Sequence, residues 1–329
     1  MNKYIFTCGD VNGIGPEIVL KTLNEIISGA NHQFIFYCPA NIFEAYAKEI
    51  NPSFNYSIVK NETEIEDEQV TIIDIGKTKF NLGKATSASG KASFKAIQRS
   101  FNMLAFNQAD AVITAPIAKI ALSKAGIKYP GHTEMFAKWS NTKDYAMTFL
   151  SEDFNAALAT IHIPIKDVPK AITEKRIRNL LRIIYNTCLF DLGIYNPKIA
   201  VLGLNPHAGE EGIIGKEEEK IIAPVLKEKE FRSFVEGCFS PDAFFANQLF
   251  RDYDFVIGMY HDQLLIPYKM LNFSNGVNYT AGLPIVRTSP DHGTAFDIAG
   301  QNIADHSSIK EAYNYAVKIV NNRKLNEEK

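Results

Sequence analysis

Short runs of β-branched and aromatic residues alternate with longer amphipathic stretches along the whole chain. Runs rich in Val, Ile, Phe and Tyr predict strands, and they are YIFTCGD (residues 4–10), QFIFYCP (33–39), VTIIDIG (70–76), ADAVITAPI (109–117), AALATIHIPI (156–165), PKIAVLGL (197–204) and DFVIGMY (254–260). The amphipathic stretches predict helices, and the clearest are residues 89–108, 173–193, 216–230 and 241–253.

Two local signals predict where helices begin. Pro16 favours a first helical turn, where its missing N–H costs nothing. Ser308 and Glu311 match a capping box, in which each side chain accepts a hydrogen bond from the other residue's backbone N–H. We therefore expect a helix that starts near residue 16 and a last helix that starts at Ser308.

The alternation of strands and helices predicts an α/β protein with a largely parallel sheet. The chain has 329 residues, which is long for a single core, so we expect two α/β/α lobes. We assign residues 1–128 and 265–329 to the first lobe and residues 129–264 to the second. These boundaries come from fold type, because composition does not mark a linker.

Polar segments rich in Gly and Pro follow the predicted strands. Ligands of open α/β sheets bind beyond the carboxyl ends of the strands, so these segments are expected to converge on one crevice. They are GDVNGIGPE (9–17), TAPIAK (114–119), IHIPI (161–165), GLNPHAGEEG (203–212) and MYHDQ (259–263).

Composition and charge exclude several classes of protein. The hydrophobic fraction is 46%, the charged fraction is 22% and the formal net charge is -2. No basic stripe is present, so we expect no nucleic-acid partner. The four cysteines are widely spaced, and no apolar segment has the length of a membrane span or signal peptide. We therefore expect a cytoplasmic protein without disulfide bonds or membrane contact.

Three histidines follow predicted strands: His162 in IHIPI, His207 in NPHAG and His261 in YHDQ. A single histidine of this kind is more often a hydrogen-bonded structural residue than a ligand. Three at strand ends favour a site, because imidazoles bind Zn, Co, Ni or Fe and three protein ligands leave positions open for substrate. Their spacing matches no local metal motif, so both interpretations stay open at this point.

The turn GDVNGIGPE (9–17) could bind an anion at a helix N-terminus, although it lacks the Gly-x-Gly-x-x-Gly spacing and is equally explained as a tight turn. SGKAS (89–93) lacks the glycine spacing of a phosphate loop. In YPGHTE (129–134), His132 and Thr133 could contact a ligand, or Thr133 could simply cap a helix. Lys269 and Arg287 lie in apolar sequence surroundings, where they could meet an anionic ligand, form internal ion pairs or reach the surface as long side chains.

Taken together, these motifs resemble the 4-hydroxythreonine-4-phosphate dehydrogenase family of vitamin B6 synthesis. The motifs are GDVNGIGPE, TAPIAK, YPGHTE, GLNPHAGEEG, YHDQLLIPYK, GVNYTAGLP and RTSPDHGTAFDIAG, in one order from Met1 to about Asp305. HGTAFDIAG also resembles the cofactor loop of the isocitrate and isopropylmalate dehydrogenases, so the resemblance implies that two-lobed fold.

The resemblance implies roles for individual residues. It assigns a divalent metal, zinc most often and cobalt or magnesium in some members, to His162, His207 and His261. It assigns substrate contacts to His132, Thr133, Lys269, Asn278 and Arg287, and the adenosine side of NAD to His292, Gly293, Thr294, Ala295 and Asp297. Asp242 and Lys269 are the two candidates for the general base. Members are homodimers with active sites at the subunit interface.

The sequence departs from the family pattern at a few positions. Val11 and Asn12 replace a usual Pro-Ala, Ala118 replaces a common Asn, and Leu264 replaces a frequent Gly. SPDAFF (240–245) keeps Asp242 but changes the residues around it. None of these is a proposed ligand, and they leave the identity of the substrate open.

The reaction implied by the resemblance is oxidation of the 3-hydroxyl of 4-phosphohydroxy-L-threonine by NAD. Loss of carbon dioxide would then give 3-amino-2-oxopropyl phosphate for pyridoxine 5'-phosphate synthesis. A metal ion would favour hydride departure by lowering the pKa of the hydroxyl. The alternatives are a dehydrogenase for 4-phospho-erythronate or D-threonate, a phosphate acyltransferase, and a non-catalytic binding protein.

Overall fold

In the computed structural model the chain folds into two compact units, and residues 1–66 and 68–327 are described. Unit 1 comprises Met1–Asn141 and Pro284–Val320, and unit 2 comprises Thr142–Leu283 and the residues from Asn321 onward. The boundaries predicted at residues 128/129 and 264/265 lie earlier in the chain than these divisions.

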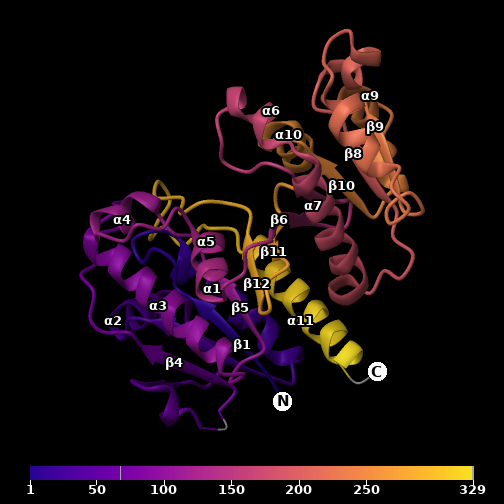
Figure 1. The fold of residues 1–329 in the computed structure, drawn as a ribbon. Helices are drawn as coiled ribbons and strands as arrows, with labels where there is room; N and C mark the ends of the chain where they lie inside the picture. The colour runs from indigo at the N-terminus through magenta and orange to yellow at the C-terminus, as the bar shows by residue number, and fades with distance from the viewer. Residues whose placement is uncertain (67, 328–329) are drawn as a thin grey trace. The chain divides into compact units, whose positions relative to one another are not determined.

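Unit 1 is built on six parallel strands (Figure 1). In spatial order these are β3 (Ser57–Val59), β4 (Val70–Asp74), β2 (His32–Cys38), β1 (Asn2–Thr7), β5 (Ala111–Thr114) and β12 (Val286–Pro290). Its helices are α1 (Gly15–Ile26), α2 (Ala40–Ile50), α3 (Ser87–Ala105), α4 (Lys119–Lys124), α5 (His132–Trp139) and the first part of α11 (Ser307–Glu327). Helix α3 packs on β1, β2 and β5.

The central strands of unit 1 are apolar because both of their faces are covered. Phe6 of β1 and Phe34 of β2 are fully buried, and both rings contact Tyr313 of α11. These contacts fix the strands whose carboxyl ends lead into the Gly9–Glu17 turn and into α2.

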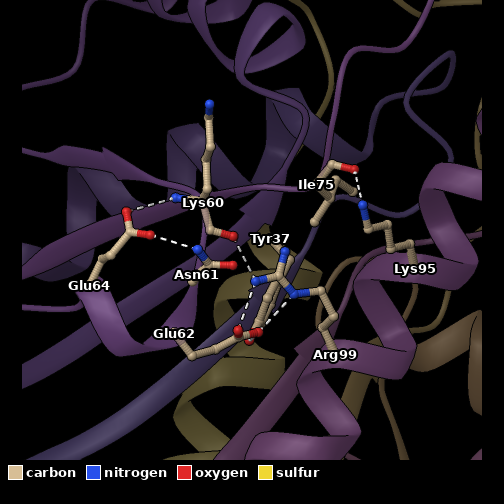
Figure 2. A network of polar contacts seen from close by, with 8 residues as sticks. All are labelled: Tyr37, Lys60, Asn61, Glu62, Glu64, Ile75, Lys95 and Arg99. Atoms are coloured by element: carbon tan, nitrogen blue, oxygen red, sulfur yellow. Dashed lines mark hydrogen bonds and ion pairs between the residues drawn. The ribbon is translucent and has the colours of Figure 1, made fainter.

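Figure 2 shows a partly exposed polar network that ties a surface turn of unit 1 to its sheet. Arg99 of α3 donates from Nε and Nη2 to the two carboxylate oxygens of Glu62, each at 2.8 Å. The hydroxyl of Tyr37, at the end of β2, donates to Glu62 at 2.8 Å. Burial, together with the neighbouring Glu62 carboxylate, raises the pKa of Tyr37, so this phenol stays protonated and keeps donating.

Unit 2 is built on six strands of mixed direction. In spatial order these are β11 (Val277–Ala281), β6 (Ala146–Leu150), β7 (Asn155–Leu158), β10 (Phe255–Gly258), β8 (Ile199–Leu202) and β9 (Val235–Phe239). Strand β6 is antiparallel to both neighbours, whereas β7, β10, β8 and β9 are parallel. The helices are α6 (Val168–Ala171), α7 (Glu174–Asn186), α8 (Ala223–Leu226), α9 (Pro241–Ala246) and α10 (His261–Leu271).

An aromatic core holds α9 and α10 against the parallel strands of unit 2. Phe154 contacts Tyr268 of α10 in an edge-on arrangement with ring centroids 5.4 Å apart, and it packs on Phe250 at 5.0 Å. Phe244 of α9 and Leu264 of α10 are buried in the same cluster. The core therefore lies directly beneath the loops that follow β7, β8 and β10.

The predicted α/β class with a largely parallel sheet is confirmed, whereas the predicted start of the last helix is wrong. Helix α11 begins at Ser307, and the side chain of Asp305 accepts from the backbone N–H and the hydroxyl of Ser307. The hydroxyl of Ser308 accepts a hydrogen bond from the backbone N–H of Asp291 instead. The SGKAS segment lies in the first turns of α3, where Thr86 and Ser89 form a reciprocal cap. Over the described residues, no helix combines the length and apolarity needed to cross a bilayer.

A buried ionic cluster anchors the end of α11 in unit 2. Asp191 accepts from Arg323 Nε at 2.7 Å and from the Tyr279 hydroxyl at 2.6 Å. The Asp191 side chain is 6% exposed and that of Arg323 is 23% exposed. Interaction with the Tyr279 oxygen and with Asp191 raises the pKa of Arg323 against the opposing effect of burial. Arg323 therefore keeps its positive charge at physiological pH and stays paired with the Asp191 carboxylate.

We predict that Arg323→Met lowers the free energy of unfolding by about 2–4 kcal/mol, because it leaves a buried carboxylate without its cation. The matched control is Arg182→Met, which removes an exposed ion pair with Glu230 and should cost far less. Urea unfolding followed by circular dichroism measures both variants. Equal losses for the two would contradict the structural role assigned to the Asp191 cluster.

Candidate functional site

The three histidines predicted as metal ligands belong to unit 2 and follow three mutually paired strands. His162 follows β7, His207 follows β8, and His261 is the first residue of α10, directly after β10. Strand β10 pairs in parallel with both β7 and β8. Parallel pairing places the three carboxyl ends at one edge of the sheet, so all three histidines project from that edge.

Two of these rings are close together. The ring centroids of His162 and His261 are 5.7 Å apart, with the planes tilted by 41°. His261 Nδ1 lies 2.7 Å from a carboxylate oxygen of Asp262. A proton on Nδ1 would donate to this carboxylate and leave the Nε2 lone pair available for a cation, which is the usual arrangement of a metal-binding imidazole.

His207 lies in an uncommon backbone segment. Five consecutive residues, His207 to Glu211, have φ between 43° and 82°. Positive φ is sparsely populated by residues other than glycine and costs about 1–3 kcal/mol at each such residue. A run of this kind needs strong support from its surroundings.

The donor types fit a divalent transition metal, but among residues 1–66 and 68–327 no three His, Cys, Asp or Glu side chains form a group that could hold an ion. His162 and His261 are brought together, and His207 comes from the neighbouring strand end. The assignment of the three histidines as ligands therefore stays a prediction.

Asp242, one candidate for the general base, is exposed in the first turn of α9. The hydroxyl of Ser240 donates to its carboxylate at 2.6 Å. This hydrogen bond, the backbone N–H of Ala243 and the nearby His207 lower the pKa of Asp242. A carboxylate with a lowered pKa is a weak proton acceptor at neutral pH, so its position favours an electrostatic role beside His207.

The other predicted residues of unit 2 lie on α10 and β11. Lys269 is exposed near the end of α10, which agrees with the surface alternative left open for it. Asn278 is half-buried in β11, where it pairs with Phe149 of β6.

Unit 1 contains the remaining predicted substrate residues. Arg287 of β12 is 3% exposed, and its Nε and Nη2 donate to the hydroxyl of Thr114 at 3.0 and 2.8 Å. Burial lowers the pKa of Arg287 to about 9, and the charge of Glu134 opposes this effect. A cation desolvated to this degree gains much from an anionic ligand.

His132 and Thr133 open helix α5 after Gly131. Burial and the charge of Arg287 lower the pKa of His132 well below its usual value, so its ring is neutral at physiological pH. Its Nε2 atom is buried and has no hydrogen-bond partner among the described residues. Thr133 is buried inside the helix, with Gly131 at the capping position. A neutral imidazole with an unsatisfied nitrogen beside a buried guanidinium is suited to a polar, negatively charged ligand.

The predicted cofactor loop also belongs to unit 1, and it packs on the first glycine-rich turn. The backbone N–H of Ile14 donates to the carbonyl of Thr294 at 3.0 Å. A side chain at Gly13 would place its Cβ 2.5 Å from that same oxygen, so only glycine permits this approach. His292 and Asp297 lie on either side of this contact, and Ala295 adopts a φ of 40°. The turn and the loop therefore form one surface.

Sequence reasoning missed the residues that support these loops. Asn12 is fully buried, and its Nδ2 donates to the carbonyl of Lys84 while its Oδ1 accepts from the backbone N–H of Asn81. Glu218 and Gln263 have comparable roles in unit 2. Their hydrogen bonds join segments far apart in the chain, so no local pattern marked them. The one available signal was the departure at Asn12 from the family's usual alanine.

Comparison with known proteins agrees with this arrangement. Residues 30–316 match the family model described as pyridoxal phosphate biosynthetic protein PdxA. A 4-hydroxythreonine-4-phosphate dehydrogenase from Sulfurihydrogenibium sp. is 39% identical and aligns over 98% of this chain and 100% of the relative. A D-threonate 4-phosphate dehydrogenase from Salmonella typhimurium is 34% identical over 95% of this chain and 97% of the relative.

Solved structures show the same likeness. The crystal structure of 4-hydroxythreonine-4-phosphate dehydrogenase from Klebsiella pneumoniae superposes with a TM-score of 0.83 at 35% identity, covering 97% of this chain and 100% of that one. Isocitrate dehydrogenase from Methylococcus capsulatus, at 14% identity and a TM-score of 0.50 over 99% of this chain and 88% of that one, shares the fold. The chain belongs to the PdxA family and is a dehydrogenase of that family.

Proposed function

We propose that this chain uses NAD and a divalent metal ion to oxidise 4-phosphohydroxy-L-threonine at its 3-hydroxyl, and that the product loses carbon dioxide to give 3-amino-2-oxopropyl phosphate. The observation that carries the metal-dependent part is the convergence of three histidine-bearing strand ends at one edge, with the His162 and His261 rings 5.7 Å apart. The Sulfurihydrogenibium relative supports the choice of substrate. The free cysteines and the absence of a bilayer-crossing helix among the described residues agree with a cytoplasmic location.

In this proposal, one set of side chains binds the metal ion and other segments bind the cofactor. His162, His207 and His261 would hold the cation as neutral imidazoles. When bound, the ion supplies Lewis-acid polarisation of the substrate's hydroxyl and carboxylate groups. The glycine-rich turn and residues 292–297 would hold NAD, which would supply the hydride acceptor.

The phosphate and carboxylate of the substrate need cations or donors that are ready before binding. Arg287 is buried and held rigidly by Thr114, so its planar fork is set for an anionic group. His132, neutral at physiological pH, offers a ring nitrogen as donor. Lys269 is exposed and has a long, flexible side chain, which suits both capture of a phosphate and proton transfer. Asp242 and Lys269 stay the two candidates for the general base: the lowered pKa of Asp242 makes that carboxylate a weak proton acceptor, and Lys269 could accept a proton only as a neutral amine.

A second substrate assignment rests on the Salmonella relative, which is named for D-threonate 4-phosphate. That molecule and 4-phospho-erythronate carry the same phosphate and carboxylate ends, and they would use the same Arg287 and Lys269 contacts. The difference lies at the substituent next to the oxidised hydroxyl.

We also propose that the enzyme is a homodimer whose partner copy covers the metal edge of unit 2. Large apolar side chains are exposed on the three segments that follow the histidines: Ile163, Ile165, Ile213, Ile214, Ile266, Met270 and Phe273. Several large exposed apolar side chains on neighbouring segments are typical of protein interfaces. A second copy placed there would exclude water from the three histidines.

The substrate prediction concerns steady-state NAD reduction. We expect the highest kcat/KM for 4-phosphohydroxy-L-threonine when it is compared with D-threonate 4-phosphate and 4-phospho-erythronate. Dialysis against a chelator should lower each rate by about 100-fold or more, and added Zn²⁺ or Co²⁺ should restore it. Full activity in metal-free protein would exclude the metal-dependent mechanism, and a preference for another acid would reassign the substrate.

His207→Asn tests the third ligand without adding backbone strain, because asparagine tolerates positive φ better than alanine does. We expect bound Zn²⁺ to fall well below one ion per chain and turnover to fall with it. His306→Asn, at an exposed histidine of unit 1 paired with Glu25, is the control and should retain the metal. Elemental analysis of both variants decides the point, and wild-type metal content in His207→Asn would make His207 a structural residue.

The dimer prediction concerns α10. Ile266 and Met270 are one turn apart, with exposed fractions of 59% and 80%. The double variant Ile266→Glu/Met270→Glu should sediment as a monomer where the wild type sediments as a dimer, because four charges would be buried in the interface. Phe106→Glu, at an equally exposed position of unit 1, should leave the dimer intact. A dimeric double variant would place the interface elsewhere.

A further inference from the structure

A set of polar side chains outside the proposed ligands joins the three histidine-bearing strand ends. The Thr160 hydroxyl, after β7, donates to the carbonyl of Met259, after β10, at 2.7 Å. Gln263, in the first turn of α10, accepts from the backbone N–H of Met259 at 2.7 Å and donates to the carbonyl of Gly203 at 2.7 Å. Gly203 directly follows β8. The ends of β7, β10 and β8 are therefore connected in series by side-chain hydrogen bonds.

Glu218 continues this series into the segment that carries His207. Glu218 is 5% exposed. One of its carboxylate oxygens accepts from the backbone N–H groups of Leu204 and Asn205 at 2.6 and 2.7 Å. The other oxygen accepts from Asn205 Nδ2 at 2.9 Å. The carboxylate thus accepts from two backbone N–H groups and one side-chain amide of the residues that precede Pro206 and His207.

The backbone also closes around the Glu218 carboxylate from the other side of His207. A Cβ on Gly203 would lie 3.1 Å from one oxygen of Glu218, and a Cβ on Gly209 would lie 2.7 Å from the other. Both glycines let the chain approach the carboxylate directly. His207 lies between these two contact points, at the start of the left-handed run. Glu218 is therefore placed to hold both flanks of a segment that would otherwise relax.

We propose that Glu218 and Gln263 are positioning residues that fix the His207 segment relative to the His261 strand end, so that both histidines could serve the proposed metal ion. This inference rests on the proposed metal-dependent function. Neither residue contacts the ion; each acts on the backbone that carries a ligand. The physical reason is that a strained segment and three separate strand ends converge on one point only when their relative positions are fixed before the ion binds.

Glu218→Gln tests the proposal, because it keeps the size of the side chain and replaces one acceptor oxygen by a donor that faces N–H groups. We expect the dissociation constant for Zn²⁺, measured by competition with a chromophoric chelator, to rise by about 10–100-fold. We also expect a changed visible absorption spectrum for the Co²⁺-loaded protein. In metal-free protein, the amide hydrogens of Leu204 and Asn205 should exchange faster. The matched control is Glu219→Gln, an exposed neighbour with the same change of charge, which should match the wild type in all three measurements.

Gln263→Glu is a milder variant that decides the case if Glu218→Gln does not fold. Its carboxylate keeps the acceptor for the Met259 N–H and loses the donor to the Gly203 carbonyl, so we expect a smaller rise in the dissociation constant. Wild-type affinity and spectrum in a folded variant would overturn the proposal. A wild-type protein that binds no Zn²⁺ would overturn the metal function itself. The two failures are distinguishable, because amide exchange is measured without metal and reports only whether Glu218 holds the backbone of Leu204 and Asn205.

Discussion

The parallel pairing of β10 with β7 on one side and β8 on the other is the constraint on which the candidate metal edge depends. Parallel strands end at the same side of a sheet, so three loops distant in the chain begin at neighbouring points. The aromatic core around Phe154 and Tyr268 holds α10 against these strands and so fixes where His261 starts its helix. Any change of register would separate the loops before their side chains could act together.

Burial has opposite consequences in different parts of the molecule. In the Asp191 cluster, oppositely charged groups meet and the ionic form is retained. Around Arg287, which donates to the neutral hydroxyl of Thr114, burial lowers the pKa of the guanidinium, and His132 beside it stays neutral. The first arrangement stabilises the fold. The second leaves the Arg287 cation desolvated, so an anionic ligand would stabilise it, which is the expected property of a binding residue.

Near His207, a backbone segment with unfavourable φ values is held by a buried carboxylate. Five positive φ values follow one another there, and the carboxylate of Glu218 and the contacts at Gly203 and Gly209 surround the segment. The glycine-rich turn of unit 1 shows the same principle, because Gly13 permits contact with Thr294 and Asn12 holds the neighbouring segment. In both units, buried polar side chains hold the loops that are expected to touch ligands.

The sequence by itself determined the α/β class, the strand ends that carry His162, His207 and His261, and the family, because periodicity and motifs are local properties. It did not reveal short strands such as β6 and β12, whose pairing depends on distant partners. It also misplaced the start of α11, where the side chain of Asp305, and not that of Ser308, accepts from a backbone N–H of the first turn. It placed Lys269 and Arg287 in similar apolar sequence surroundings, although Lys269 is exposed and Arg287 is buried. Only the tertiary structure decided these matters and the roles of Glu218, Gln263 and Asn12, because burial and hydrogen bonds between segments far apart in the chain arise when those segments pack.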